Sequence, residues 1–233
     1  MLIGIEMIWG DVERRDIHPF TVPAIRSLDR IDFTAPVTFL CGENGSGKST
    51  LIEGLAVAAG FNAEGGPPGL MFETRSSHSS LHEHLRLSWR GARRTGHYLR
   101  AETFYNSSTA REEILGIDLH SRSHGELFLD ALEPFAGRKP ALHLMDEPES
   151  ALSVPSQLRL LRLLYDAANA GDQFLISTHS PILLASPGAT ILRLDDAGIS
   201  RVAYRDTEQY QLTKDFLDAP EAFFRHLLAE DDA

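Results

Sequence analysis

The segment VTFLC-GENGSGKST-LIEGLAVAAG, residues 37–60, constrains the fold of this chain more than any other stretch. VTFLC is a short, apolar, β-rich run that predicts a buried strand. In LIEGLAVAAG the apolar residues recur at helical spacing, and Gly60 marks the end of the helix. The order of strand, glycine-rich loop and helix is typical of a phosphate-binding loop in an α/β fold.

The loop itself, residues 42–49, matches the pattern G-x-x-x-x-G-K-[ST] in full. Its internal glycines allow the backbone to curl so that successive N–H groups point into one concavity, and the following helix adds partial positive charge. Lys48 can reach the β- and γ-phosphates of a nucleotide, Ser49 can bind Mg²⁺, and Thr50 can contact the α-phosphate. The candidate nucleotide-binding residues here are Gly42, Glu43, Asn44, Gly45, Ser46, Gly47, Lys48, Ser49 and Thr50.

Two adjacent carboxylates follow another apolar strand in ALHLMDEPES, residues 141–150. Neighbouring residues at a strand end point in different directions, so the two acids can have separate roles. Asp146 is predicted to hold Mg²⁺ together with Ser49, and Glu147 to orient or deprotonate an attacking water. The structural alternative is a polar turn after a core strand.

A histidine follows a third apolar strand in FLISTHSP, residues 174–181. His179 can hydrogen-bond a γ-phosphate and so report its presence. The alternative is an ordinary exposed loop histidine.

Short apolar strands alternate with helical segments along much of the chain, which predicts a mostly parallel sheet flanked by helices. Two pairs of alternating runs predict an added antiparallel portion. The expected elements are strands at 37–41, 141–145 and 173–177, helices at 127–135 and 153–171, hairpins at 85–106 and 191–204, and a helical tail at 213–228 broken near Pro220. Without a clear linker, residues 1–233 are expected to form one domain.

Composition excludes several classes of protein. The formal net charge of −11 opposes sequence-independent nucleic-acid binding, which depends on neutralising phosphates. The single cysteine, Cys41, permits no intramolecular disulfide and fits a reducing compartment. The sequence contains no run of eighteen apolar residues, so no membrane span is predicted. The N-terminus carries no basic leader, and we therefore expect a cytoplasmic protein.

Two local clusters have alternative interpretations. Arginines crowd the 85–106 region at Arg86, Arg90, Arg93, Arg94 and Arg100. They are interpreted as the basic edges of a solvated hairpin rather than as a nucleic-acid patch, because the overall charge is acidic. His78, His82 and His84 are not in an HExxH arrangement, so we expect solvated side chains rather than a metal site.

In this order the motifs resemble those of an ATP-binding-cassette (ABC) ATPase. GENGSGKST resembles its Walker A motif, LHLMDEP its Walker B motif, STHSP its switch-histidine loop and SALS its D-loop. SRSHGE, residues 121–126, occupies the place of the family signature. Ser123, Gly125 and Glu126 match that signature, whereas His124 stands where the family usually has glycine. Ser123-x-x-Glu126 is also an ordinary helix capping box.

Other family features match loosely. The first glutamine, Gln157, follows Walker B, so Glu102 is the candidate substitute for the family's Q-loop glutamine. Phe20 and Phe33 could stack on adenine or belong to the core. The sequence contains no N-K-x-D segment of the kind that binds guanine, which disfavours GTP. It also contains no long heptad segment, so no coiled-coil arm is predicted. The pattern is more similar to SMC-like and stand-alone AAA-family ATPase heads than to transporter subunits.

The resemblance implies an ATPase with ATP and Mg²⁺ as cofactors, with Ser49 and Asp146 on the metal and Glu147 and His179 catalytic. It further implies a homodimer that forms around ATP, in which Ser123 and Gly125 of one copy complete the other copy's site. Three alternatives stay open: the ATPase subunit of a membrane transporter, a DNA-repair or chromosome-associated head, and a nucleotide sensor without hydrolysis. A protein or DNA partner is left unidentified, and no direct membrane insertion is expected.

Overall fold

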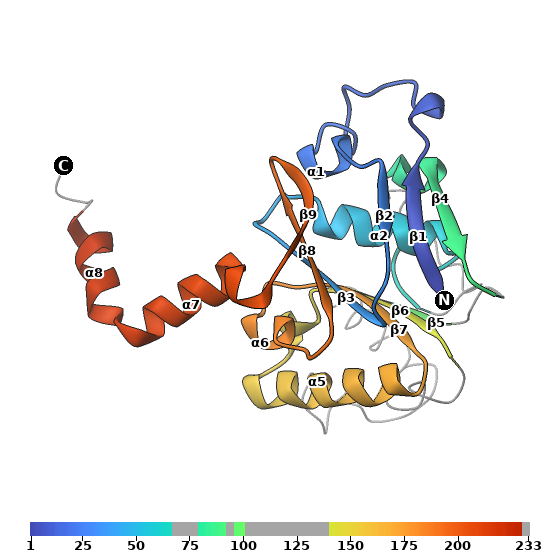
Figure 1. Cartoon of the computed structure of the whole chain (residues 1–233). Coiled ribbons are helices and arrows are strands. Elements are labelled where there is room, and N and C mark those ends of the chain that lie inside the picture. Colours follow the sequence, from blue (N-terminus) through green and yellow to red (C-terminus); the bar gives the residue numbers. More distant parts are fainter. Residues whose placement is uncertain (67–78, 92–95, 101–139, 230–233) are drawn as a thin grey trace, which may run out of the picture.

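The computed structural model describes residues 1–66, 79–91, 96–100 and 140–229 of the chain. Its centre is a six-stranded sheet with the order β5–β6–β7–β3–β8–β9 (Figure 1). These strands are β3 (Val37–Cys41), β5 (Gly96–Arg100), β6 (Leu142–Asp146), β7 (Gln173–Ser177), β8 (Thr190–Asp195) and β9 (Gly198–Val202). All pairs are parallel except β8 with β9. The predicted α/β class, with a mostly parallel sheet, is confirmed.

A second, antiparallel sheet has the order β2–β1–β4. Its strands are β1 (Leu2–Met7), β2 (Arg30–Asp32) and β4 (Leu85–Trp89). The side chain of Gln173 in β7 joins the two sheets, because its Oε1 accepts from Leu2 N and its Nε2 donates to Leu2 O, both at 2.8 Å. The added antiparallel portion was expected, but the sequence did not predict β1 as its central strand.

The expected hairpin over 85–106 is wrong. β4 pairs antiparallel with β1, whereas β5 pairs in parallel with β6, so the two runs belong to different sheets. In β5, adjacent Tyr98 and Leu99 are both buried, which is typical of a strand covered on both faces rather than of a solvated hairpin. Alternation and a short connection favour a local partner, and a distant partner overrode that preference here.

Helices cover both faces of the central sheet (Figure 1). α2 (Lys48–Ala58) lies between the two sheets and contacts β4, β6 and β7, while α5 (Val154–Asn169) packs on the opposite face against β7. The predicted apolar stripe of α2 is buried throughout. α5 begins where predicted, because the Ser153 side chain accepts from Ser156 N, and Gly171 follows its end with a φ of +103°.

The remaining described helices are short or terminal. They are α1 (Pro23–Arg26), α6 (Pro181–Leu184), α7 (Glu208–Asp218), α8 (Pro220–Ala229) and the 3₁₀ turns η1 (Trp9–Asp11), η2 (Ser80–His84), η3 (Pro148–Ala151) and η4 (Tyr204–Asp206). The break expected at Pro220 separates α7 from α8, although α7 begins earlier than predicted. The second hairpin, β8–β9, is confirmed with its turn before Gly198.

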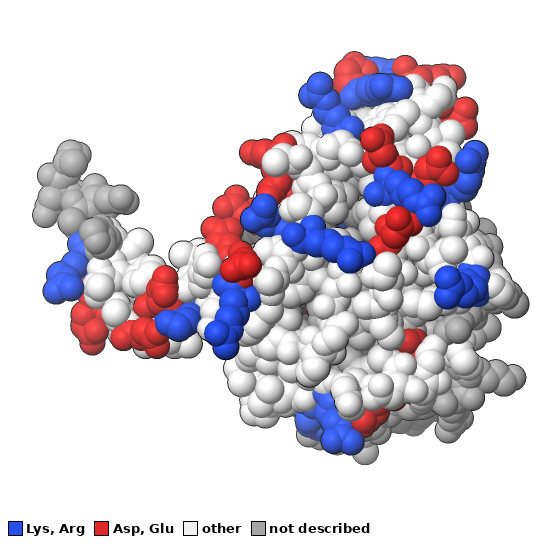
Figure 2. Space-filling view, viewed as in Figure 1, with Lys and Arg blue, Asp and Glu red and all other residues white. Residues whose placement is uncertain are grey.

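Two apolar cores lie on the two faces of the central sheet. Successive strand residues alternate between them: Leu40 joins the α2 side, whereas its neighbours Phe39 and Cys41 join the α5 side. α7 and α8 extend away from this body (Figures 1 and 2). None of the helices in the described part of the chain has the length and apolar character that crossing a membrane requires.

Candidate active site

The loop between β3 and α2 curls tightly at three glycines with positive φ. Gly42 has φ +145°, Gly45 has φ +81°, and Gly47, at φ +100°, caps the start of α2 in the left-handed region. A Cβ at Gly42 would overlap the Leu194 carbonyl oxygen, whereas one at Gly45 would meet nothing within 4 Å. Glycine is therefore required at residue 42 by contact as well as by conformation.

Lys48 lies under this curl. Its Nζ donates to the carbonyl oxygens of Gly42 at 3.0 Å and of Glu43 at 2.9 Å, and the residue is 3% exposed. Burial lowers the pKa of Lys48, while the carboxylates of Glu147 and Asp146 act in the opposite direction. The lysine predicted to contact phosphates is thus placed within the electrostatic influence of both predicted carboxylates.

The loop also has features that fit a bound phosphate chain. Ser46 Oγ is buried and has no hydrogen-bond partner within the described residues. The loop N–H groups precede α2, whose first turn carries Ser49 and Thr50, both partly exposed. A phosphate oxygen could accept hydrogen bonds from this buried hydroxyl and from the N–H groups at the helix N-terminus.

Asp146 is the last residue of β6 and is 7% exposed. Its Oδ1 accepts from Ser177 Oγ at 2.5 Å, across the neighbouring strand β7. Asp146 ends β6 and Ser49 follows the loop after β3, so both lie at the same edge of the sheet. Carboxylate and hydroxyl oxygens are ligands of the kind that Mg²⁺ prefers. Ser177 was not among the residues predicted from the sequence, although its place at the end of QFLIS could have indicated it.

Glu147 adopts a left-handed conformation, with φ +48° and ψ +55°. Its backbone N–H donates to Ser177 O and to Ser177 Oγ, both at 3.1 Å. Such a conformation is costly for a residue with a side chain, by about 1–3 kcal/mol. The turn gives the two adjacent carboxylates different surroundings: Asp146 is buried, whereas Glu147 Oε1 lies 3.5 Å from His179 Nε2.

Glu149 is a site residue that the sequence analysis missed. Its Oε1 accepts from the backbone N–H of His179 at 2.5 Å, which ties the turn after β6 to the turn after β7. Burial raises the pKa of Glu149, partly opposed by the hydrogen bonds from His179 N–H and the Thr178 hydroxyl. The segment 150–153 closes the same turn, because Ser150 Oγ donates to Glu147 O at 2.9 Å.

Arg100 corrects the interpretation of the arginine cluster as hairpin edges. Its Nη1 lies 2.8 Å from Glu53 Oε2 of α2, and its Nε lies 3.8 Å from Asp146 Oδ2. Arg86, by contrast, pairs at the surface with Glu6 at 3.4 Å. Arg93 and Arg94 lie outside the described residues. The cluster therefore does not form one surface, and Arg100 belongs to the candidate active site.

Several predicted residues cannot be placed. Ser123, Gly125, Glu102 and the helix expected at 127–135 all lie outside the described residues.

Other predicted positions have structural roles. Phe20 and Phe33 are 3% and 4% exposed and belong to the α2-side core. The His84 ring packs edge-on against Phe20, with 5.3 Å between the ring centroids. His82 and His84 are half-buried, whereas we expected solvated side chains. His78 lies outside the described residues. No group of potential metal ligands of the His, Cys, Asp and Glu type gathers among the residues that the structure describes.

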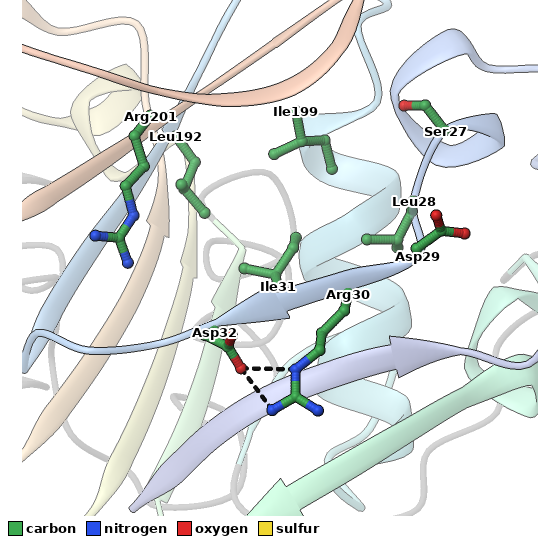
Figure 3. A pocket seen from close by; sticks show the side chains of 9 residues that line it. All are labelled: Ser27, Leu28, Asp29, Arg30, Ile31, Asp32, Leu192, Ile199 and Arg201. Carbon is green, nitrogen blue, oxygen red and sulfur yellow. Dashed lines mark hydrogen bonds and ion pairs between the residues drawn. The ribbon is translucent and has the colours of Figure 1, made fainter.

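A separate pocket of about 260 Å³ opens between β2 and the β8–β9 hairpin (Figure 3). Four charged residues line it, and two of them, Arg30 and Asp32, pair with each other at 2.7 Å. The lining contains no residue of the 42–50 loop and neither Asp146 nor Glu147. The candidate active site is therefore the edge of the sheet at the ends of β3, β6 and β7, and not this pocket.

Family models match two parts of the chain. Residues 16–100 match a model described as "AAA domain", and residues 127–185 match one described as "AAA domain, putative AbiEii toxin, Type IV TA system". The first match contains the glycine-rich loop, and the second contains both carboxylates and His179. A comparison with curated proteins gives no match.

Similar folds occur among solved structures. The SMC head domain from Thermotoga maritima is 16% identical, with a TM-score of 0.45 over 75% of this chain and 92% of that one. The ATP-binding subunit of an ABC transporter is 17% identical, with a TM-score of 0.45 over 88% and 91% of the two chains.

The two AAA-domain matches, together with the phosphate-binding loop and the paired carboxylates, support a P-loop ATPase.

Proposed function

We propose that this chain is an Mg²⁺-dependent ATPase that acts as an ATP-driven dimerising switch. The observation that carries the proposal is the adjacency of β6, β7 and β3 in the sheet, because the ends of these strands place Asp146, Glu147 and the loop of the buried Lys48 at one edge. A polar turn without function would have no reason to place two carboxylates and a lysine around a glycine-rich loop.

The triphosphate would lie in the loop of residues 42–50, where backbone N–H groups, Ser46 Oγ and Lys48 Nζ supply donors. Ser49 and Asp146 are the residues that would hold Mg²⁺. When bound, the metal neutralises phosphate charge and favours departure of the leaving oxygen. Lys48 must exchange its bonds to Gly42 O and Glu43 O for phosphate oxygens, so nucleotide binding would rearrange the loop.

Glu147 would accept a proton from the attacking water. The water oxygen forms a bond to the γ-phosphorus, the bond from that phosphorus to the β–γ bridging oxygen breaks, and the products are ADP and phosphate. His179 Nε2 lies 3.5 Å from Glu147 Oε1, so it would orient that carboxylate, and in the proposed mechanism it would also contact the γ-phosphate. Glu149 fixes the backbone of His179 and so positions both groups.

The dimerising role rests on the motif resemblance. Ser123 and Gly125 of a second copy would complete the site at the γ-phosphate, which would make ATP part of the interface. ATP then favours the dimer because it binds that state better, and hydrolysis removes the preference. We place the protein in the cytoplasm and treat residues 1–233 as one domain.

Two of the open alternatives need partners of different chemistry. Basic and acidic side chains are intermixed on the face shown in Figure 2, which offers no broad basic surface for DNA there. A DNA-associated head would show turnover stimulated by DNA and steeply weakened by salt. A transporter motor would need a separate membrane subunit.

The test combines phosphate release with size-exclusion chromatography of Glu147→Gln. We expect turnover to fall about 100-fold or more, because general-base catalysis contributes at least that factor, and we expect an ATP-dependent dimer to accumulate. Lys48→Ala should bind no ATP and stay monomeric, while Glu13→Gln, at an exposed glutamate, should behave as wild type. Wild-type turnover by Glu147→Gln, with no dimer in ATP, would refute the proposal. Nucleotide binding without phosphate release by the wild type would favour the sensor alternative.

A further inference from the structure

Arg100 ends β5 directly beside the carboxylate that is proposed to bind Mg²⁺. In the parallel β5–β6 pair, Arg100 is in register with Asp146, so both side chains leave the same edge of the sheet. Neither the motif resemblance nor the proposed mechanism gives Arg100 a role. Its side chain is 23% exposed and lies among acidic groups that are more buried still.

The guanidinium makes unequal contacts with two carboxylates. Nη1 donates to Glu53 Oε2 at 2.8 Å, whereas Nε stays 3.8 Å from Asp146 Oδ2, which is beyond hydrogen-bond distance. The side chains of Glu53 and Asp146 are 16% and 8% exposed. Because arginine is always charged, it compensates both acids while bonding only one of them.

Glu53 is itself well fixed. It lies four residues after Ser49 in α2, so the two side chains share one face of that helix. Its other oxygen, Oε1, accepts from the backbone N–H of Ser79 at 3.2 Å. The helix that carries Ser49 thus also carries the group that holds Arg100.

We infer that Glu53 is a positioning residue that holds Arg100 off Asp146, an inference that rests on the proposed function. A guanidinium released from Glu53 would bond Asp146 directly, because a charge-assisted, bidentate arginine–carboxylate pair is strong. Asp146 would then have to give up that pair before it could bind a metal. The contact between Glu53 and Arg100 leaves the Asp146 carboxylate near a compensating charge but free of a direct hydrogen bond to the guanidinium.

The experiment measures binding of a fluorescent ATP analogue as Mg²⁺ is titrated, with a parallel measurement in EDTA. Glu53→Asp keeps the charge but shortens the side chain by one methylene, so it should release Arg100. We expect the half-saturating Mg²⁺ concentration to rise about tenfold, the scale typical of lost support for a metal ligand, with nucleotide affinity in EDTA unchanged.

The decisive variant is the double substitution Glu53→Asp with Arg100→Gln. Without the guanidinium the arginine no longer competes for Asp146, so the Mg²⁺ requirement should return to within about threefold of wild type. Glu6→Asp, at the exposed pair with Arg86, is the matched control and should change nothing. Should Glu53→Asp fail to fold, Glu53→Gln, alone and with Arg100→Gln, tests the same suppression.

Two results would overturn the inference. One is a Glu53→Asp protein with the wild-type Mg²⁺ requirement; the other is a defect that persists after Arg100→Gln, because a purely structural role of Glu53 would not be suppressed. Wild-type protein that binds no nucleotide at any Mg²⁺ concentration would instead refute the proposed function itself.

Discussion

Individual glycines in the 42–50 loop are constrained to different degrees. Gly42 and Gly45 both have positive φ, but only a Cβ at Gly42 would overlap backbone, at the Leu194 carbonyl. We therefore expect Gly45→Ala to lower the free energy of unfolding by about 1 kcal/mol, the cost of strained φ alone. Gly42→Ala should cost about 3 kcal/mol or more, because overpacking adds to that strain. Urea denaturation of the pair checks this, and equal losses would contradict it.

Glu149 makes stability depend on pH with a definite sign. Burial raises its pKa in the folded state, so as pH rises the unfolded chain releases this proton first. The contribution of Glu149 to stability therefore falls as pH rises from its ordinary value, near 4.3, through the raised one. Glu149→Gln keeps an oxygen to accept from His179 N–H but cannot ionise, so its stability relative to wild type should increase with pH.

Denaturation at about pH 4 and about pH 7 measures this difference, with Glu13→Gln as the same substitution at an exposed position. A stability of Glu149→Gln relative to wild type that stays constant, or that falls as pH rises, would contradict the account.

The sequence predicts the chemistry of single residues where a motif fixes their spacing. The loop of 42–50, Asp146, Glu147 and His179 all follow from such patterns, and the structure brings the described ones to one edge of the sheet. Arg100 and Glu53 escape prediction because they meet only through the fold, 47 positions apart. Nothing local distinguishes Arg100 from the other arginines of its cluster.

At the scale of elements, the side chain of Gln173 connects β1 to the central sheet by hydrogen bonds. Gln173 Oε1 and Nε2 pair with both backbone groups of Leu2, at the N-terminal end of β7. Gln173→Ala would leave a buried N–H and a buried C=O without partners, and each such group costs about 1–3 kcal/mol. We expect a loss of about 3 kcal/mol in the free energy of unfolding. Gln211→Ala, at an exposed position in α7, is the control, and similar losses for both variants would refute this role.

Elements with local signals are predictable within a residue or two. β3, β7, α2 and the start of α5 follow from apolar periodicity, glycine stops and a serine cap, all of which act over a few residues. Strand pairing is not predictable in the same way. β4 and β5 are correctly placed as strands, yet their partners β1 and β6 lie far away along the chain. A short connection between two strands gives no information on such non-local contacts.

At the scale of the whole molecule, the fold gathers four separate segments at one sheet edge. The ends of β3, β5 and β6 bring together Lys48, Arg100 and Asp146, which are distant in sequence, and the end of β7 adds Ser177, which donates to Asp146. Parallel strands make this possible, because their carboxyl ends all meet at the same edge.

The exposed apolar residues of the C-terminal helices contribute to neither core; they include Leu212, Leu217, Phe224, Leu227 and Leu228.

The central claim is that the 42–50 loop and Asp146 bind MgATP, and that a second copy closes the site. A crystal structure of Glu147→Gln with ATP and Mg²⁺ tests it most directly. The account predicts a triphosphate along the loop, Mg²⁺ on Ser49 and Asp146, and Ser123 of a partner copy at the γ-phosphate. Nucleotide bound elsewhere, or bound in the loop while residues 121–126 stay far from every γ-phosphate in every assembly, would contradict it.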